Sequence, residues 1–420
     1  FDFKFSMRGR IGVLQSLKKS TPETKLASRL FGGSVSGNPP ANRIAALWGN
    51  GDFGRLGLGG VESHSRPTVC SALVNESLRD IACGGAHTLF LTESGRVYAT
   101  GLNDFGQLGV SKEKRYTAEP LKVCGLPNEV AYISAGYYHS SAITVDGKLF
   151  MWGKNSNGQL GLGKRAPKVV SEPCQVDSLD GMTITMSALG GEHSVAVTEE
   201  GEVLSWGNGT LGKLGHDYES SFWGFKSRSE YTPRLITKLA GAKVKNIAAG
   251  LLHTACIDEN GSVFVFGEGL NKFASIEQMP SMVAELPVSG EIACGGYHIC
   301  AVTNGGQLYI WGSNESGCLG PGESSNLPRR VEGPFLRLPV CKVSCGWKHT
   351  TALAGGNLYA WGWGGANGAF SDDGLSSGGQ LGQGDDSDHE LPALVHFGRG
   401  LKPFKVSCGF NHTAALLQST

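Results

Sequence analysis

The segment WGKNSNGQLG at residues 152–161 decides the fold, because altered copies of it recur along the chain. Each copy starts with a short hydrophobic run that ends in a glycine, and these seven glycines are Gly49, Gly101, Gly153, Gly207, Gly267, Gly312 and Gly362. A turn of the pattern G-Q-L-G or G-K-L-G follows, at Gly106–Gly109, Gly158–Gly161, Gly212–Gly215 and Gly379–Gly382, with looser copies at Gly54–Gly57 and Gly317–Gly320. The segment is therefore one unit of a repeat.

A second motif, G-x-x-H, accompanies every copy of the first. Its histidines are His87, His139, His193, His253, His298, His349 and His412. From His87 to His412 the chain runs 325 residues in six intervals, a mean period of about 54. A repeat of that length indicates a solenoid, a propeller or an array.

The repeat unit has the pattern of short antiparallel strands. We interpret IACGGAHTLFL at residues 81–91 as a first strand and RVYATG at residues 96–101 as a second, joined by a hairpin turn at Glu93–Gly95. Each unit then holds about four strands, which is the size of one propeller blade.

The two ends of the chain predict how the ring closes. The first repeat begins with a second strand at residues 44–49, and the last ends with a first strand at residues 404–416. Pairing these two strands would remove two exposed sheet edges. The sequence predicts an all-β, seven-bladed β-propeller over residues 43–420, closed by pairing of its N- and C-terminal strands.

The combination of both motifs resembles the regulator of chromosome condensation family over roughly residues 44–418. A kelch propeller has a similar period but a different motif. The departures are Thr100 in the place of tryptophan, and residues 268–273, which lack the G-Q-L-G turn.

Composition excludes several functional classes. The 37 basic and 37 acidic residues balance, so overall charge does not direct the chain to nucleic acid. The 11 cysteines form no C-x-x-C pair or zinc spacing, and Cys83, Cys294, Cys345 and Cys408 share one repeat position as small buried residues. No apolar segment has membrane-spanning length. No catalytic motif is present, so we expect a protein without enzymatic activity, cofactor, metal or membrane insertion.

Residues 1–42 differ from the rest of the chain because they are basic, rich in serine and poor in acidic residues. That composition is typical of a mitochondrial or chloroplast transit peptide. A disordered basic arm is the alternative. We expect the mitochondrial matrix, with the nucleus or the chloroplast as alternatives.

The repeated histidines and tryptophans are expected to be structural. Sevenfold pseudosymmetry places one histidine in each blade, whereas a zinc site needs three or four ligands at one point. We expect these rings to be buried and to bond loop backbone. The family that this chain resembles also includes the plant ultraviolet-B photoreceptor, which uses several clustered G-W-R-H-T motifs. This chain has one near match to that motif, at Gly346–Thr350. We therefore do not expect photoreception from this chain.

Binding residues are expected where the repeat breaks. The insertion at residues 216–231 carries aromatic and basic residues of the kind found in binding hot spots: Tyr218, Phe222, Trp223, Phe225, Lys226 and Arg228. Loops after the G-x-L-G turns should emerge on one face and form a basic arc with Lys112, Lys114, Arg115, Lys164, Arg165, Lys168, Arg329 and Arg330. Scattered solvated charge and self-packing aromatics are the alternatives.

The resemblance, taken with the basic arm, implies a function. The plant mitochondrial branch of the family supports organelle RNA splicing and respiratory complex I assembly. We expect a non-catalytic scaffold that binds protein partners, and RNA or ribonucleoprotein as well. The alternative that the resemblance implies is a guanine-nucleotide exchange factor for a small GTPase. The sequence does not identify the partner, the face of the propeller that binds it, or the oligomeric state.

Overall fold

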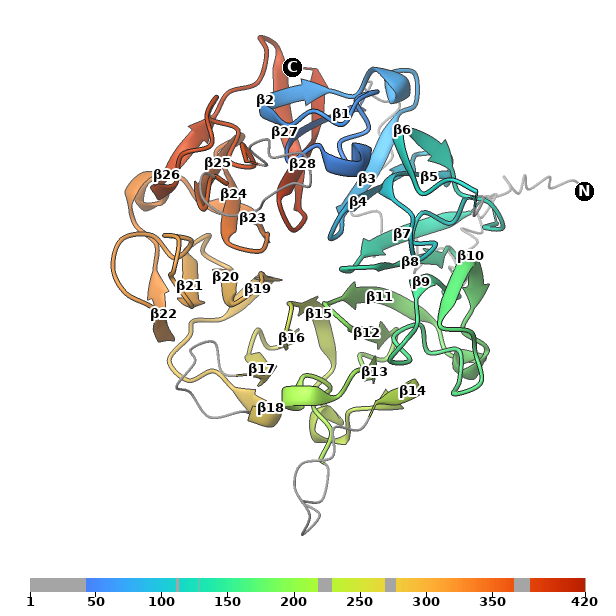
Figure 1. Ribbon diagram of the computed structural model, residues 1–420. Helices are drawn as coiled ribbons and strands as arrows, with labels where there is room; N and C mark the ends of the chain where they lie inside the picture. The colour runs from blue at the N-terminus through green and yellow to red at the C-terminus, as the bar shows by residue number, and fades with distance from the viewer. Residues whose placement is uncertain are drawn as a thin grey trace, which may run out of the picture.

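The computed structural model describes residues 43–110, 113–127, 129–217, 229–268, 277–365 and 378–419. These residues form seven four-stranded antiparallel sheets arranged as blades around a central axis (Figure 1). Among them, no helix combines the length and the apolar character that crossing a bilayer would need. The predicted seven-bladed all-β propeller is confirmed, whereas the basic arm at residues 1–42 lies outside the described residues.

The blades follow one another along the chain, and six of them are built from four consecutive strands. Their strands are β3 (Leu78–Cys83), β4 (His87–Thr92), β5 (Val97–Leu102) and β6 (Tyr116–Lys122); β7 (Val130–Ala135), β8 (His139–Thr144), β9 (Leu149–Lys154) and β10 (Val169–Gln175); β11 (Ile184–Leu189), β12 (His193–Thr198), β13 (Val203–Gly207) and β14 (Glu230–Leu235); β15 (Val244–Ala249), β16 (His253–Asp258), β17 (Val263–Gly267) and β18 (Glu277–Met282); β19 (Ser289–Cys294), β20 (His298–Thr303), β21 (Leu308–Gly312) and β22 (Ser325–Arg330); β23 (Val340–Cys345), β24 (His349–Ala354), β25 (Asn357–Gly362) and β26 (His389–Val395).

The seventh blade combines both ends of the chain. It contains β1 (Arg43–Gly49), β2 (His64–Val69), β27 (Leu401–Cys408) and β28 (His412–Ser419), in the order β2-β1-β28-β27. β1 pairs with β28 without a register shift, from Arg43 opposite Gln418 to Gly49 opposite His412. The predicted closure by terminal strands is therefore confirmed.

Short 3-10 helices lie in the connections between strands. They are η1 (Asp52–Gly54), η2 (Ser71–Leu73), η3 (Asp177–Leu179), η4 (Thr210–Gly212), η5 (Thr237–Leu239) and η6 (Gly333–Leu336).

The reading of residues 81–91 as one strand is wrong. The chain forms β3, turns at residues 84–86, and returns as β4. The turn is tight because Gly84 lies against the ring of His87: a Cβ at Gly84 would come within 2.4 Å of the His87 Cε1. The same correction applies at the C-terminus, where residues 404–416 span β27 and β28.

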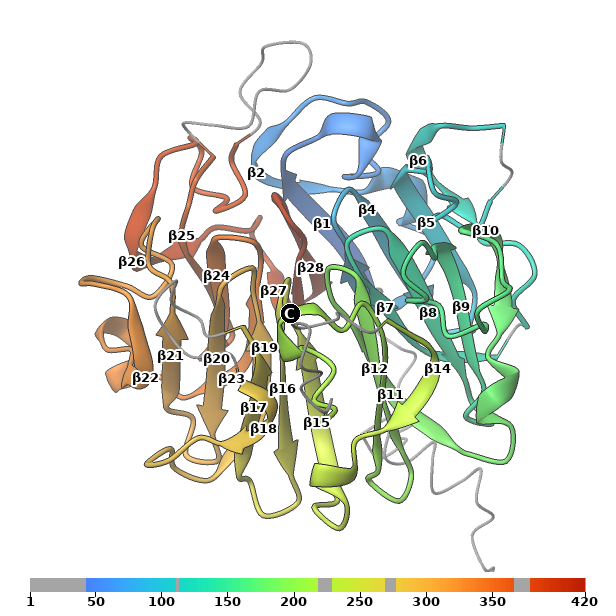
Figure 2. The ribbon, with the colours of Figure 1, turned by 60° about the horizontal axis from the view of Figure 1, so that its bottom comes forward.

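The first strands of the blades (β3, β7, β11, β15, β19, β23 and β27) contact one another in sequence and line the central channel. Each second strand begins at its histidine, opposite the glycine at or next to the end of the third strand, as His87 lies opposite Gly101. Loops after the third strands therefore leave the sheet beside the turns between first and second strands. We call this side of the propeller the loop face; it faces the viewer in Figure 1 and lies at the top in Figure 2.

A belt of backbone hydrogen bonds links successive blades at the loop face. The N–H of Gly85 donates to the carbonyl of Gly136 in the next blade over 3.1 Å, and the N–H of Tyr137 donates to that of Gly190 over 3.1 Å. The belt closes where the N–H of Phe410 donates to the carbonyl of Gly84 over 3.1 Å. The glycine of G-x-x-H thus supplies an acceptor to the neighbouring blade.

The buried histidines add a second set of links. His87 Nε2 lies 2.9 Å from the hydroxyl of Ser140 in the next blade, and that hydroxyl donates to the backbone carbonyl of Gln107 over 2.7 Å. Because the hydroxyl hydrogen is used by the carbonyl, the histidine Nε2–H is the donor to the oxygen. The rings were expected to bond loop backbone, and the structure corrects this: six of the seven histidines reach the backbone through a hydroxyl, and His253 is the exception.

The indole of the hydrophobic run strengthens the same contact. Trp152 Nε1 donates to the carbonyl of Gln107 over 2.9 Å, so one carbonyl of the G-Q-L-G turn accepts two bonds from the following blade. Where Thr100 replaces tryptophan, its hydroxyl donates to the carbonyl of Gly54 over 2.9 Å. The link between blades is kept by a different donor.

Candidate functional site at the channel mouth

The central channel opens on the loop face into a hollow of about 110 Å³. Its rim is built from the residue after each G-x-x-H glycine, so every blade contributes one position: Gly85, Tyr137, Gly191, Leu251, Gly296, Trp347 and Phe410. Three of the seven are aromatic, and these bring their rings together from blades that are far apart in the sequence.

A continuous aromatic surface crosses this rim. Trp347 stacks on Phe410 with ring centroids 4.2 Å apart and an interplanar angle of 14°, and Phe410 meets Tyr137 edge to face at 5.1 Å. Tyr137 contacts Tyr138 at 4.3 Å. We call the six linked rings the mouth surface: Phe105, Tyr137, Tyr138, Trp347, Trp363 and Phe410.

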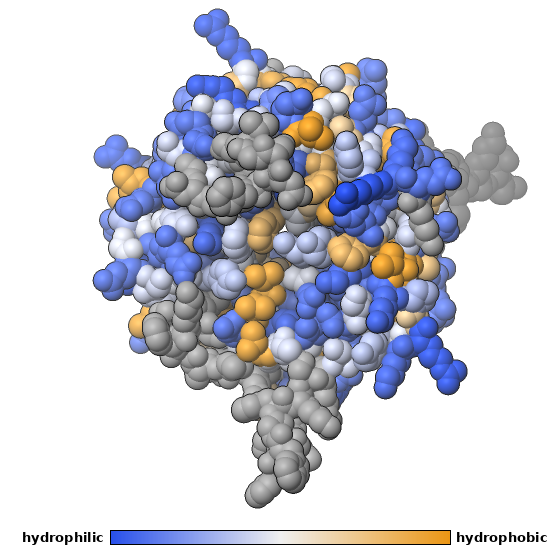
Figure 3. Space-filling model, viewed as in Figure 1, coloured by the Kyte–Doolittle hydropathy of each residue, from blue (hydrophilic) through white to orange (hydrophobic). Residues whose placement is uncertain are grey.

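The two ends of the mouth surface come from other parts of the repeat. Phe105 belongs to the loop after β5 and contacts Tyr138 at 4.8 Å, whereas Trp363 follows β25 and contacts Trp347 at 5.6 Å. Trp363 is buried and the other five rings are half-buried. Figure 3 shows hydrophobic patches around the centre of the loop face, within a mostly hydrophilic rim.

Lysine ammonium groups lie over these rings. Lys348 Nζ is 4.9 Å from the Trp347 ring centroid, and Lys154 Nζ is 5.4 Å from that of Tyr138. Both lysines are also paired with carboxylates, Lys154 with Glu192 at 3.1 Å and Lys348 with Glu315 at 3.6 Å. The two ammonium groups stabilise the aromatic rings through cation–π contacts and place positive charge beside them.

A buried guanidinium supports the rim from below. Arg55, which occupies the glutamine position of its G-x-L-G turn, donates from Nη1 to the carbonyl of Gly85 over 3.3 Å and from Nε to the carbonyl of Asp52 over 3.0 Å. Burial lowers the pKa of Arg55 to about 10, and the charge of Asp52 opposes this shift. Arg55 remains protonated at neutral pH and carries a positive charge next to Tyr137.

The buried Lys213 occupies the corresponding position in another blade. Its ammonium donates to the Thr210 hydroxyl over 2.6 Å and to the Thr210 carbonyl over 3.2 Å. Burial lowers the pKa of Lys213 to about 8, and Glu192 opposes the shift.

Part of the predicted basic arc lies in loops beside one end of the mouth surface. Lys114 and Arg115 are exposed at the end of the loop that also holds Phe105, and Arg115 pairs with Asp104 at 3.0 Å. A second group of exposed residues, in the loop after β9 and in the same blade as Tyr138, comprises Lys164, Arg165 and Lys168. Lys112 lies outside the described residues.

Arg329 and Arg330 were expected in a loop of the same arc, and this placement is wrong. Both are the final residues of the outer strand β22, whose first residue, Ser325, is the end nearer the loop face. Arg330 is paired with Tyr309 toward the opposite face. The Arg329 side chain folds back and donates from Nη1 to the carbonyl of Glu323 over 3.2 Å.

The predicted aromatic insertion lies outside the described residues: Tyr218, Phe222, Trp223, Phe225, Lys226 and Arg228. So does most of the glycine-rich insertion after Trp363, at residues 366–377. The mouth surface was missed from the sequence. The sequence does show that one repeat position is aromatic at residues 137, 347 and 410. Only the arrangement of the blades around one axis shows that these three side chains lie close together.

Comparisons with known proteins agree with this architecture. The RCC1-like domain family profile matches residues 45–415. The Ultraviolet-B receptor UVR8 of Arabidopsis thaliana is 33% identical over 367 residues, which is 84% of this chain and 77% of that protein. The probable E3 ubiquitin-protein ligase HERC4 of Homo sapiens is 31% identical over 66% of this chain, but the match spans only 31% of HERC4.

Two crystal structures share the fold at low sequence identity. Human WBSCR16 superposes with a TM-score of 0.76 at 24% identity, over 90% of this chain and 99% of that one. Prp20p of Saccharomyces cerevisiae, described with its binding to Gsp1p and histones, superposes with a TM-score of 0.77 at 23% identity, over 91% and 93%.

Proposed function

We propose that this chain, which belongs to the RCC1-like domain family, is a non-catalytic scaffold that holds an RNA or ribonucleoprotein partner on its loop face. We further propose that it does so in mitochondrial RNA processing, specifically splicing, and thereby supports the assembly of respiratory complex I. Propellers of this family bind proteins: Prp20p binds Gsp1p and histones, and yeast RCC1 has been crystallised with Kap60.

The mouth surface is the observation that carries the proposal. Aromatic rings that are half-buried and ordered by their neighbours can stack on unpaired bases at little entropic cost, and stacking contributes roughly 1–3 kcal/mol per base. Lys154 and Lys348 place ammonium groups beside those rings. The exposed loop residues Lys164, Arg165 and Lys168 would extend a phosphate-binding track away from Tyr138.

The mitochondrial location rests on the composition of residues 1–42. Eight basic residues stand among the first 43 residues against two acidic ones, Asp2 and Glu23. Such an arm supports import into the matrix, where intron-containing transcripts and their processing proteins would be the available partners.

Ultraviolet crosslinking of the tagged protein in isolated mitochondria tests the proposal. We expect organellar transcripts or their processing proteins to be recovered with the wild-type chain, and several-fold less with Trp347→Ala. Phe404→Leu is the matched control. The Phe404 ring also has a cation near it, the Arg43 guanidinium at 5.1 Å from the ring centroid, but Phe404 lies on the far side of the propeller from the mouth. Recovery of neither transcripts nor processing proteins with the wild-type chain would contradict the proposal.

Nucleotide exchange on a small GTPase is the second candidate. It is favoured by the likeness to Prp20p, a protein that binds Gsp1p. Purified protein should then accelerate release of a labelled guanine nucleotide from a small GTPase. A flat response across a panel of GTPases would dismiss this candidate and leave the first one standing.

A further inference from the structure

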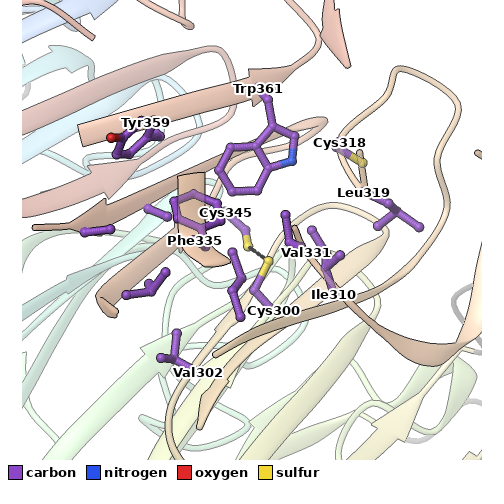
Figure 4. Packing of buried hydrophobic residues seen from close by; sticks show 14 residues of the cluster. Cys300, Val302, Ile310, Cys318, Leu319, Val331, Phe335, Cys345, Tyr359 and Trp361 are labelled. Atoms are coloured by element: carbon purple, nitrogen blue, oxygen red, sulfur yellow. Dashed lines mark hydrogen bonds between the residues drawn. The ribbon is translucent and has the colours of Figure 1, made fainter. Parts of the chain in front are cut away.

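Two thiols from neighbouring blades face each other in the buried core. Cys300 lies on β20, and Cys345 is the last residue of β23 in the next blade. Their sulfur atoms are 3.2 Å apart, and both residues are buried, Cys300 fully and Cys345 with 8% exposure. Figure 4 shows the pair enclosed by aliphatic and aromatic side chains, including Phe335 and Trp361.

An imidazole completes the group. His298 precedes Cys300 by two residues on β20, so both side chains lie on the same side of the strand. A ring nitrogen of His298 and the two sulfur atoms all lie within 4.8 Å of one another. A neutral imidazole is a common metal ligand.

The sevenfold repeat supplies six internal comparisons for this arrangement. Cys300 stands two residues after its histidine, and Cys345 is the last residue of the next blade's first strand. The other six pairs at these positions are Leu89 and Ala135, Ser141 and Leu189, Val195 and Ala249, Ala255 and Cys294, Thr351 and Cys408, and Ala414 and Cys83. Only Cys300 and Cys345 place two sulfur atoms together, so the propeller architecture does not require a thiol pair here.

We propose that Cys300, Cys345 and His298 bind a thiophilic d10 metal ion, Zn2+ or Cu+, between two blades. Thiolate and imidazole are the ligands that such ions prefer. A tetrahedral site with Zn–S bonds of about 2.3 Å places two sulfur atoms about 3.8 Å apart, so the sulfurs would separate by only about 0.6 Å. A disulfide would instead require them to close by about 1.1 Å, to a bond of about 2.05 Å.

Charge and coordination number are also compatible with the buried position. Zn2+, two thiolates and a neutral imidazole sum to zero charge, which avoids burying a net charge. The fourth position on zinc would be filled by water, as in zinc sites with three protein ligands. Cu+ needs only the three ligands, and its site is neutral when one of the two thiols keeps its proton. Binding therefore releases two thiol protons to solvent for Zn2+ and one for Cu+, and changes no oxidation state.

Metal stoichiometry of the full chain tests the proposal. The protein is reduced and stripped of metal under anaerobic conditions, then dialysed separately against Zn2+ and Cu+, and bound metal is measured by atomic emission. We expect about one equivalent of at least one of the ions, and an increase in Tm of the loaded protein. The two dialysis arms identify which ion the site takes.

Variants assign the ligands. Cys300→Ser and Cys345→Ser should each reduce the affinity at least a hundredfold, and the apo Tm of each variant reports whether it has folded. Cys408→Ser is the matched control, because Cys408 faces Thr351 at 3.2 Å between the next two blades and should keep full metal binding. The double variant Cys300→Ala/Cys345→Ala measures the background metal binding and serves in place of a serine variant that fails to fold.

Two outcomes would overturn the proposal. One is that the wild-type chain binds no more of either ion than the double alanine variant. The other is that the protein purified without reductant carries a Cys300–Cys345 crosslink in its peptide map, and the reduced form binds neither ion.

Discussion

His412 and Thr88 are 324 residues apart in the chain, yet the Nε2–H of His412 lies 2.9 Å from the Thr88 hydroxyl, to which it donates. Thr88 in turn donates to the carbonyl of Arg55 over 2.8 Å. This contact repeats the histidine–hydroxyl link of the internal blades at the seam where the chain closes on itself. The last blade is therefore held to the first by the same interaction that joins consecutive blades.

Deletion of residues 404–420 should abolish cooperative folding. The truncation removes β28 and most of β27, leaves β1 with one unpaired edge and exposes the core of the closing blade. Loss of a sharp thermal transition in circular dichroism is the expected result. An unchanged Tm would show that the ring does not depend on this closure.

One link between blades is missing and can be restored. The position that receives His253 is Ile299 rather than a hydroxyl residue, and His253 Nε2 has no hydrogen-bond partner among the described atoms. Ile299→Thr should be more stable than Ile299→Val, which has the same shape without the hydroxyl, by about 1 kcal/mol. Urea unfolding of the two variants measures the difference, and equal stabilities would argue against the link.

The buried histidines should make the protein sensitive to acid. Burial lowers the pKa of His87, His298 and His349 to about 3 and that of His139 and His253 to about 4, from an ordinary value of 6.5. Above pH 6.5 these rings are neutral in both the folded and the unfolded chain. Below pH 6.5 the histidines of the unfolded chain become protonated, whereas the buried rings of the folded chain stay neutral until the pH approaches their lowered pKa.

Each of these histidines should therefore lower the free energy of unfolding by about 1.4 kcal/mol per pH unit between pH 6.5 and the folded pKa. We expect Tm to fall steeply from pH 6.5 to pH 4. Replacing His139 by glutamine, which retains a hydrogen-bond donor, should reduce that slope. A Tm independent of pH over this range would contradict the assignment of neutral buried rings.

Trp347→Ala should weaken binding of single-stranded RNA to the purified protein about tenfold, because one stacking platform is lost. The variant should remain folded, since Trp347 is half-buried at the rim and lies outside the blade cores. Fluorescence anisotropy with a labelled oligonucleotide measures the affinity, with Phe404→Leu as the control. Equal affinities for wild type and Trp347→Ala would remove the mouth surface from the binding site.

Residues 1–42 should direct the chain to mitochondria. A fluorescent fusion that carries these residues is expected to accumulate in the organelle, and one that starts at residue 43 is expected to stay outside it. Nuclear accumulation of the complete fusion would favour the nucleotide-exchange alternative.

The sequence predicted the fold well because the fold depends on features that each repeat carries by itself. Gly101 shows why: its φ is +112°, and a Cβ there would come within 2.4 Å of the Ala86 carbonyl, so glycine is required in every copy. The boundary between the first and second strands was missed, because the turn at residues 84–86 lies within a run that is apolar and small throughout.

The site was harder to predict. Arg329 and Arg330 were assigned to a loop because charged residues after a turn suggest solvent, but an outer strand is also solvent-exposed on one face. The mouth surface joins Tyr137, Trp347 and Phe410, which belong to three different repeats and have no common local pattern beyond their position.

The sequence by itself determined the number of blades, the seam and the glycines, because strand alternation, tight turns and left-handed backbone are local properties. Only the tertiary structure decided which side chains meet: the aromatic rings around the channel and the thiols of Cys300 and Cys345. The physical reason is that a closed ring brings the same position of every repeat to one axis and places each blade against the next. The repeat does not require a particular residue at those positions, so each copy of the repeat can carry a different one.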